Sequence, residues 1–159
     1  MVADGLGHGV EAFRAARAAT ELLAGREHWS VSDLLQEAHG ALRATRGAAI
    51  SLASLDLQTG QLQFAGVGNV SASVHDAHHR KQMITHNGIV GHNMRRLLPV
   101  EVELDDHLFI LCSDGLQSQW SLDDFPGIET RHPAGIAAML SKKHCRVRDD
   151  VTVVAIRRR

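Results

Sequence analysis

The sequence predicts an α+β fold, an α-β-β-α sandwich in which helices flank two antiparallel sheets. Two helical patterns come first, strand patterns with a two-residue period follow between residues 48 and 112, and one more helix precedes a final apolar strand. Strands grouped in this way, with helices before and after them, favour sheets covered by helices. The 159 residues suit one domain, residues 1–159.

The chain opens with a short apolar run, Met1–Ala3, which predicts a strand that ends at Asp4. A helix is expected over residues 8–24. Its predicted buried face contains residues three or four positions apart, namely Phe13, Ala16, Thr20 and Leu23.

A second helix is expected to begin after Ser30, which forms a capping-box pattern with Asp33. Its apolar positions are spaced for one helical face: Val31, Leu34, Leu35, Ala38 and Leu42. Gly47 is expected to end it. The two helices should pack as an antiparallel pair.

Residues 49–57 and 61–68 predict a hairpin that turns near Gly60. Residues 69–74 alternate apolar and polar side chains and predict a further strand, and residues 81–86 a weaker one. The alternating residues 100–104 and the apolar run 108–112 predict a second hairpin, turning at Asp105 and Asp106. Pro133 fits the first turn of a helix, and residues 151–156 predict the last strand.

The composition excludes several classes of protein. The net charge of −1 gives no general attraction to nucleic acid or to a membrane surface. No apolar run is long enough for a transmembrane helix, and the N-terminus lacks the pattern of a signal peptide. Cys112 and Cys145 form no CxxC pair or disulfide framework, which fits the reducing cytoplasm.

Three aspartates stand at predicted strand ends: Asp4, Asp114 and Asp149. A carboxylate at the end of a buried strand is costly to desolvate unless something compensates its charge. Three such ends could meet at one edge of a sheet, where hard oxygen ligands suit Mg²⁺ or Mn²⁺. Each aspartate alone also fits a simpler structure, such as a helix cap at Asp4 or a turn at Asp114.

Glycines at positions 5, 7 and 9 follow the first strand and could indicate a phosphate-binding loop. The dinucleotide fingerprint fails, because Val10 occupies the position of its last glycine and a second helix follows instead of a strand. The alternative is that glycine lets the backbone approach a metal closely, with the Gly5 carbonyl as a ligand.

Four motifs together resemble the PPM family of metal-dependent serine/threonine phosphatases: VADGLGHG, GVGN, LFILCSDGLQSQW and RDDVTVV. The segments TRGAAISLASLD and NGIVGHNMRR are similar to the SpoIIE/RsbX-like bacterial branch. The resemblance implies two Mn²⁺ or Mg²⁺ ions. Asp4 would bridge them, the Gly5 carbonyl would be a ligand, and Asp114 and Asp149 would complete the catalytic set, with Asp150 outside it.

The sequence departs from this family at two places. Some relatives carry a histidine two residues after the bridging aspartate, where this chain has Leu6, so His8 is only a candidate acid. Family members also have strands before the point at which this sequence starts. We therefore expect a sandwich that lacks those strands, with an open sheet edge that favours self-association.

The resemblance implies hydrolysis of phosphoserine or phosphothreonine by metal-activated water, in bacterial stress or sigma-factor signalling. Its partner would be a phosphorylated regulatory protein of the STAS-domain type, with no nucleic acid or membrane involved. Two alternatives stay open. One is a catalytically impaired module that binds a regulatory protein, and the other is a phosphoesterase for small molecules.

Overall fold

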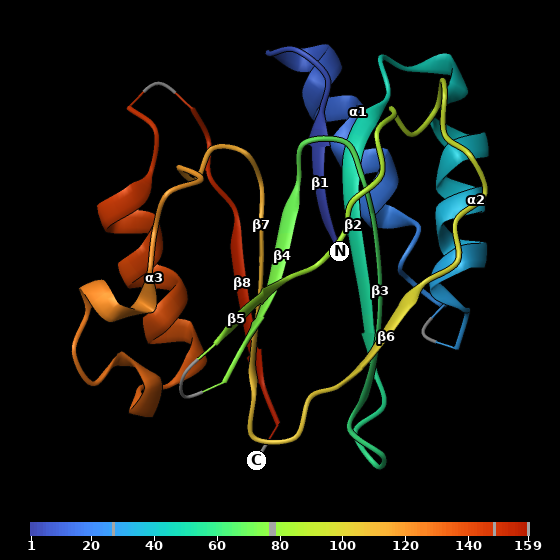
Figure 1. Cartoon of the computed structure of the whole chain (residues 1–159). Helices are drawn as coiled ribbons and strands as arrows, with labels where there is room; N and C mark the ends of the chain where they lie inside the picture. Colours follow the sequence, from blue (N-terminus) through green and yellow to red (C-terminus); the bar gives the residue numbers. More distant parts are fainter. Residues whose placement is uncertain (27, 77–78, 148, 159) are drawn as a thin grey trace.

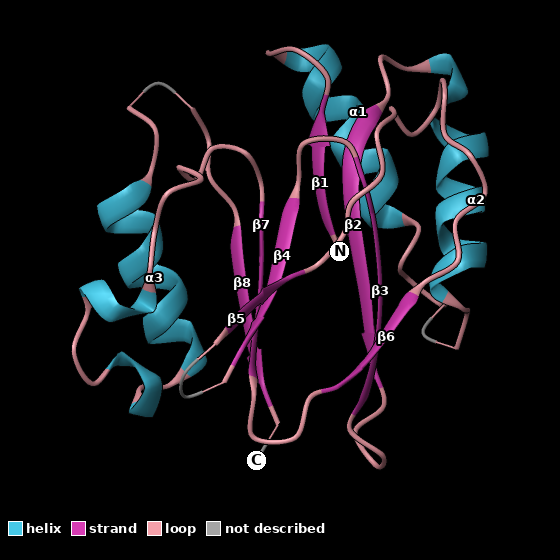
Figure 2. Ribbon diagram, in the orientation of Figure 1, coloured by secondary structure: helices cyan, strands magenta, loops and turns pink. Residues whose placement is uncertain are grey.

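Two antiparallel sheets face each other at the centre of the protein, and helices cover the outer face of each (Figures 1 and 2). The computed structural model describes residues 1–26, 28–76, 79–147 and 149–158. The first sheet has the strand order β1-β2-β3-β6, formed by Val2–Gly5, Ala48–Leu55, Gln61–Val67 and Val100–Glu103. The second has the order β5-β4-β7-β8, formed by Arg80–Gln82, Ser71–His75, Leu108–Cys112 and Val153–Arg157.

The helices divide between the two outer faces. Helices α1 (Val10–Glu21) and α2 (Val31–Ala41) lie on the first sheet, and α3 (Pro133–His144) lies on the second (Figure 1). Short 3₁₀ turns span Leu42–Ala44, Leu122–Asp124 and Ile128–Thr130. The predicted α-β-β-α sandwich is thereby confirmed.

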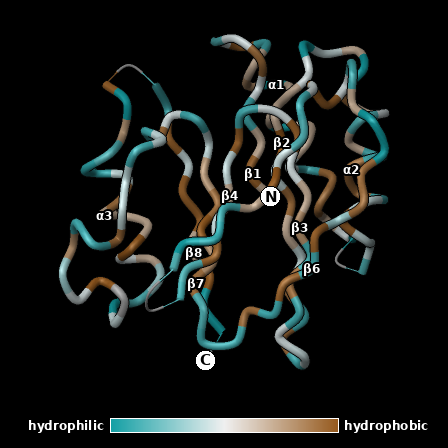
Figure 3. The backbone as a smooth tube through the Cα atoms, in the orientation of Figure 1, coloured by the Kyte–Doolittle hydropathy of each residue, from teal (hydrophilic) through white to brown (hydrophobic). Residues whose placement is uncertain are grey.

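Three apolar layers hold the sandwich together. Many of the hydrophobic residues lie along the strands in the middle of the molecule (Figure 3). Between the sheets, the rings of Phe64 and Phe109 meet edge to face with centroids 6.0 Å apart. The central strands of the second sheet, β4 and β7, are buried on both faces, so even the polar side chains of Ser73 and His75 are covered. They satisfy each other through a hydrogen bond of 2.8 Å.

Helix α1 turns a different face inward from the one that its sequence predicts. Its buried residues are Ala12, Ala15 and Ala19, whereas Phe13 is 62% exposed. The reason is close packing: a Cβ on Gly5 would lie 1.9 Å from the Ala12 carbonyl oxygen. Only small side chains fit between a helix and a strand at this separation.

Helix α2 agrees with its sequence pattern. The Ser30 hydroxyl accepts a hydrogen bond of 3.1 Å from the Asp33 amide, as a helix cap does. All five predicted apolar positions are buried, from Val31 to Leu42. The helix ends at Ala41 and continues as a 3₁₀ turn instead of running on to Gly47.

The predicted hairpin at Gly60 is present, but the one at Asp105 and Asp106 is wrong. Strand β6 pairs with β3, and β7 pairs with β4 and β8, so the connection crosses from one sheet to the other. Asp105 forms an ion pair with Arg158, and Asp106 adopts a left-handed φ of 59°. Alternation indicates which side chains of a strand share a face, but it does not identify the strand's partner.

None of the helices in the described part of the chain combines the length and the apolar character that a bilayer-spanning helix needs.

Candidate metal centre

The predicted aspartates meet at one end of the sandwich. Asp4 lies in β1, Asp114 follows β7, and Asp149 and Asp150 precede β8. All four aspartates and the loops around them line one cavity of about 210 Å³, the carboxylate cavity. It is lined by Asp4, Gly5, Leu6, Gly7, Ala49, Asn69, Asp114, Asp149 and Asp150.

Strand pairing places these residues side by side. Asp4 lies opposite Ala49 in the antiparallel register of β1 and β2. Ser113 and Thr152 continue the pairing beyond the ends of β7 and β8. The Ser113 amide donates a hydrogen bond of 3.1 Å to the Thr152 carbonyl. The Thr152 amide donates one of 3.0 Å to the Ser113 hydroxyl. The residues next to this pair, including Asp114, are thereby held at the same end of the sheet.

Two glycines allow the chain to pack this closely. A Cβ on Gly115 would lie 1.9 Å from the Asp150 carbonyl oxygen, so the turn after Asp114 rests directly on the segment before β8. Gly5 has a similar role against helix α1. Its missing side chain therefore serves the packing of α1, whereas the sequence suggested only an approach to a metal.

Asn69, Arg146 and Gly115 are the residues that sequence reasoning missed. The Asn69 amide donates a hydrogen bond to the Asp114 carboxylate. The Arg146 Nε donates one of 2.8 Å to the Asp114 carbonyl oxygen. The signals were present, because Asn69 comes just after a strand and Arg146 lies three residues before Asp149. His8 is exposed and is not among the residues that line the cavity.

Burial and the neighbouring carboxylates together change the pKa of Asp4. Burial is the largest cause, followed by a hydrogen bond with Asp114 and the charges of Asp114, Asp150 and Asp149; together they raise the pKa of Asp4 to about 7. A bound cation would reverse this effect, because it favours the ionised carboxylate.

The donor set suits a hard divalent cation. Carboxylate oxygens and a nearby backbone carbonyl are the ligands that Mg²⁺ and Mn²⁺ prefer. Across the described residues, however, no three His, Cys, Asp or Glu side chains already form a closed metal-binding group. The four carboxylates nevertheless line one cavity, and Asp4 and Asp114 are close enough to share a hydrogen bond.

Comparisons with known proteins agree with this architecture. The family described as Stage II sporulation protein E (SpoIIE) matches residues 1–159. No curated protein gives a significant match.

Solved structures give the same result. One solved structure is described as the bacterial stressosome, a modular system that has been adapted to control secondary messenger signalling. Its sequence is 30% identical to this chain. It aligns with a TM-score of 0.86 over 96% of this chain and 81% of that chain.

Two more distant neighbours share the fold. RsbX in complex with magnesium is 21% identical, with a TM-score of 0.79 over 96% of this chain and 77% of that chain. The PP2C phosphatase domain of SpoIIE from Bacillus subtilis, with a fragment of its regulatory domain, is also 21% identical. Its TM-score is 0.76 over 98% of this chain and 52% of that chain. The match along the whole sequence shows that this chain belongs to the Stage II sporulation protein E (SpoIIE) family.

Proposed function

We propose that the protein hydrolyses phosphoserine or phosphothreonine in a regulatory protein, with two divalent cations, Mg²⁺ or Mn²⁺, at the carboxylate cavity. Asp4, Asp114, Asp149 and the Gly5 carbonyl would hold them. The observation that carries this proposal is the gathering of four aspartates from three separate segments in one cavity. When bound, such cations lower the pKa of water and neutralise phosphoryl oxygens.

The residues around the cavity have supporting tasks. Asn69 restrains the Asp114 carboxylate through its amide, and Arg146 restrains the Asp114 backbone. Hydrogen bonds of this kind orient a ligand and raise its affinity for a metal. Ionised Asp4 is needed to bind a cation, so cation binding would displace the proton that Asp4 holds near neutral pH.

The family and its neighbours support a role in sigma-factor regulation or stress signalling. The neighbour described under the bacterial stressosome supports a signalling role, and the magnesium complex of RsbX supports a divalent cation at the site. We propose that the substrate is a phosphorylated regulator of the STAS-domain type and that the reaction takes place in the cytoplasm.

Manganese-dependent hydrolysis of a phosphoserine peptide tests the proposal, with Asp114→Asn as the inactive variant. Asp114→Asn should lower kcat/KM by roughly 100-fold or more, because one charged ligand is lost. Asp106→Asn is the matched control. Asp106 is exposed at the opposite end of β7, and asparagine tolerates its positive φ. Activity that survives without divalent cations, or in Asp114→Asn, would contradict the proposal.

A second candidate function is a phosphatase fold that only binds a regulatory protein. It is favoured by the absence of a closed metal-binding group among the described side chains. This candidate predicts that Asp114→Asn keeps partner binding and that the wild-type protein shows no metal-dependent turnover. Hydrolysis of nucleotide or sugar phosphates in preference to phosphopeptides would instead indicate a small-molecule phosphoesterase.

We also propose self-association through strand β8. Among the described strands, β8 pairs with β7 alone, and every residue of it is half-buried. An unpaired strand edge is a template for pairing with a second copy. A monomer mass by light scattering at high protein concentration would rule this out.

A further inference from the structure

A second and larger cavity lies beside the carboxylates. It has a volume of about 660 Å³, within the range of ligand-binding pockets, and is lined by Val67 at the end of β3 and by residues 86–88 and 93–97. Figure 1 shows the segment between β5 and β6 passing to the α2 side of the molecule and then descending along α2. We call this cavity the basic groove.

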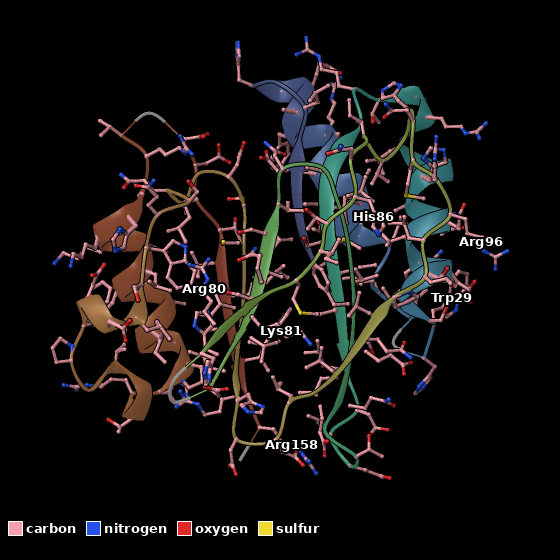
Figure 4. The ribbon with its side chains drawn as sticks, in the orientation of Figure 1. Trp29, Arg80, Lys81, His86, Arg96 and Arg158 are labelled. Carbon is pink, nitrogen blue, oxygen red and sulfur yellow. The ribbon has the colours of Figure 1, made fainter. Side chains whose placement is uncertain are left out.

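The lining of the basic groove carries two arginines, Arg95 and Arg96, and no carboxylate. Arg95, Arg96 and His86 contribute exposed side chains, and the remaining polar lining consists of two asparagines. Arg95 and Arg96 form no hydrogen bond or ion pair with any described residue. In Figure 4 the Arg96 side chain projects outward on the α2 side, whereas His86 lies nearer the sheet. Unpaired arginines around a cavity favour an anionic ligand.

The wall that carries these arginines is fixed in place. The His86 carbonyl accepts a hydrogen bond of 2.9 Å from the Gly68 amide, and its own amide donates one of 2.8 Å to Gly66. Further along, Val90 and Ala48 exchange backbone hydrogen bonds of 2.9 and 3.1 Å.

The far end of the wall is tied to helix α2. The Ser32 hydroxyl donates a hydrogen bond of 3.1 Å to the Leu97 carbonyl, immediately after the two arginines. A groove fastened at both ends needs little ordering when a ligand binds, which increases affinity.

The basic groove and the carboxylate cavity share a wall. Val67 lines the groove, and Asn69, two residues later, lines the cavity and contacts Asp114. A Cβ on Gly68 would lie 2.6 Å from the Ala49 Cβ and 3.4 Å from the Gly88 carbonyl oxygen. Ala49 belongs to the cavity lining and Gly88 to the groove lining, so the backbone at Gly68 separates the two spaces.

We propose that the basic groove binds an acidic segment of the protein substrate, next to its phosphorylated residue. This inference rests on the proposed phosphatase function. A substrate chain with its phosphate at the carboxylate cavity would continue past Asn69 and Gly68 into the groove, where its Asp or Glu side chains meet Arg95 and Arg96. The groove would thereby select phosphorylation sites with acidic flanking residues over neutral ones.

Binding can be tested without catalysis or metal. The probe is a fluorescently labelled, unphosphorylated peptide rich in Asp and Glu, measured by anisotropy in EDTA against the same peptide with Asn and Gln. Wild type should prefer the acidic peptide, and Arg95→Glu/Arg96→Glu should weaken its binding by about tenfold. Arg96→Gln should give a smaller loss. Equal affinity in wild type and the double variant would overturn the proposal.

Arg43→Glu/Lys142→Glu is the matched control, because it makes the same change in net charge at exposed residues outside the groove lining. If it weakens the acidic peptide as much as Arg95→Glu/Arg96→Glu does, general electrostatics explains the binding and the groove does not. Thermal unfolding of all variants checks that each is folded.

Kinetics separates this inference from the function on which it rests. With Mn²⁺, kcat/KM is measured for acidic-flanked and neutral-flanked phosphoserine peptides and for p-nitrophenyl phosphate. The ratio of acidic to neutral peptide should fall toward one in Arg95→Glu/Arg96→Glu. If wild type hydrolyses all three but shows no flank preference, the inference is wrong and the phosphatase function stands. If nothing is hydrolysed, the proposed function fails, and the anisotropy result still shows whether the groove binds acidic peptides.

Displacement of the labelled peptide by inorganic phosphate or a nucleotide at equal concentration would overturn the proposal in favour of a small phosphorylated ligand.

Discussion

The Asn69 amide donates a hydrogen bond to the Asp114 carboxylate, although the two residues lie 45 positions apart in the sequence. Asn69 belongs to the turn between β3 and β4, and Asp114 to the turn after β7. The bond therefore joins the loops of the two facing sheets at the mouth of the carboxylate cavity.

Asn69→Ala should weaken Mn²⁺ binding by roughly 10–100-fold, because the Asp114 carboxylate loses the donor that orients it. Isothermal titration calorimetry measures this directly. Gln58→Ala, in the exposed turn before β3, is the control and should bind Mn²⁺ as wild type does. Unchanged affinity in Asn69→Ala would show that Asp114 is not a ligand or needs no orientation.

Asp4→Asn should stabilise the metal-free protein, on the order of 1 kcal/mol after allowance for solvent screening, because it removes a partly buried charge from a cluster of like charges. The pKa of Asp4 is raised from 3.8 to about 7, so the folded state binds the extra proton between these values. Its contribution to stability therefore falls as the pH rises from about 4 to about 7.

Urea unfolding in EDTA at pH 5 and pH 7 measures this effect. The advantage of Asp4→Asn over wild type should be larger at pH 7 than at pH 5. Added Mn²⁺ should stabilise wild type and leave Asp4→Asn nearly unaffected. An Asp4→Asn variant that is less stable than wild type at pH 7 in EDTA would contradict the repulsion argument.

His75 should make the protein sensitive to acid. Burial, and then the charge of Arg80, lower the pKa of His75 to about 4, while its ring stacks on Trp120 with centroids 5.5 Å apart. The unfolded chain takes up this proton near pH 6.5, so stability falls as the pH drops from about 6.5 toward 4.

The slope from one proton is at most about 1.4 kcal/mol per pH unit. His75→Gln should remove that slope from the unfolding free energy, whereas the exposed His28→Gln should keep it. Parallel pH curves for wild type and His75→Gln would show that His75 does not titrate differently on folding.

Gly115→Ala should destabilise the protein by about 2 kcal/mol or more, because its new methyl group would overlap the Asp150 carbonyl oxygen. Mn²⁺ affinity should fall as well, since the Asp114 turn must move. Gly135→Ala is the matched control: its Cβ meets nothing within 4 Å in helix α3, so it should stabilise by about 0.5–1 kcal/mol. Chemical denaturation of both variants gives the comparison, and equal stabilities would refute the packing argument.

The sequence was informative where local chemistry determines the structure. The Ser30 cap and the α2 stripe depend on residues within a few positions of one another, so their pattern sufficed. The meeting of Asp4, Asp114 and Asp149 was also foreseeable, since each one ends or begins an apolar run. Their roles as metal ligands stay predictions.

Long-range packing explains what the sequence did not predict. The inward face of α1 depends on how closely Gly5 lets the helix approach, which no helical periodicity contains. The false hairpin at Asp105 arose because both segments are strands, as predicted, but their partners lie in different sheets. Asn69 was overlooked because its partner, Asp114, is remote in the sequence.

The crossing at Asp105 and Asp106 has a consequence for how the chain reaches its native state. Strands β1, β2, β3 and β6 form one sheet, while β4, β5, β7 and β8 form the other, so neither sheet comes from a continuous stretch of sequence. The first sheet needs β6, which comes after β4 and β5 in the sequence, and the second sheet begins only after β1, β2 and β3. Such interleaving gives many contacts between distant residues, and folding should be slow and all-or-none. Neither half of the polypeptide, cut between β5 and β6, should fold without the other.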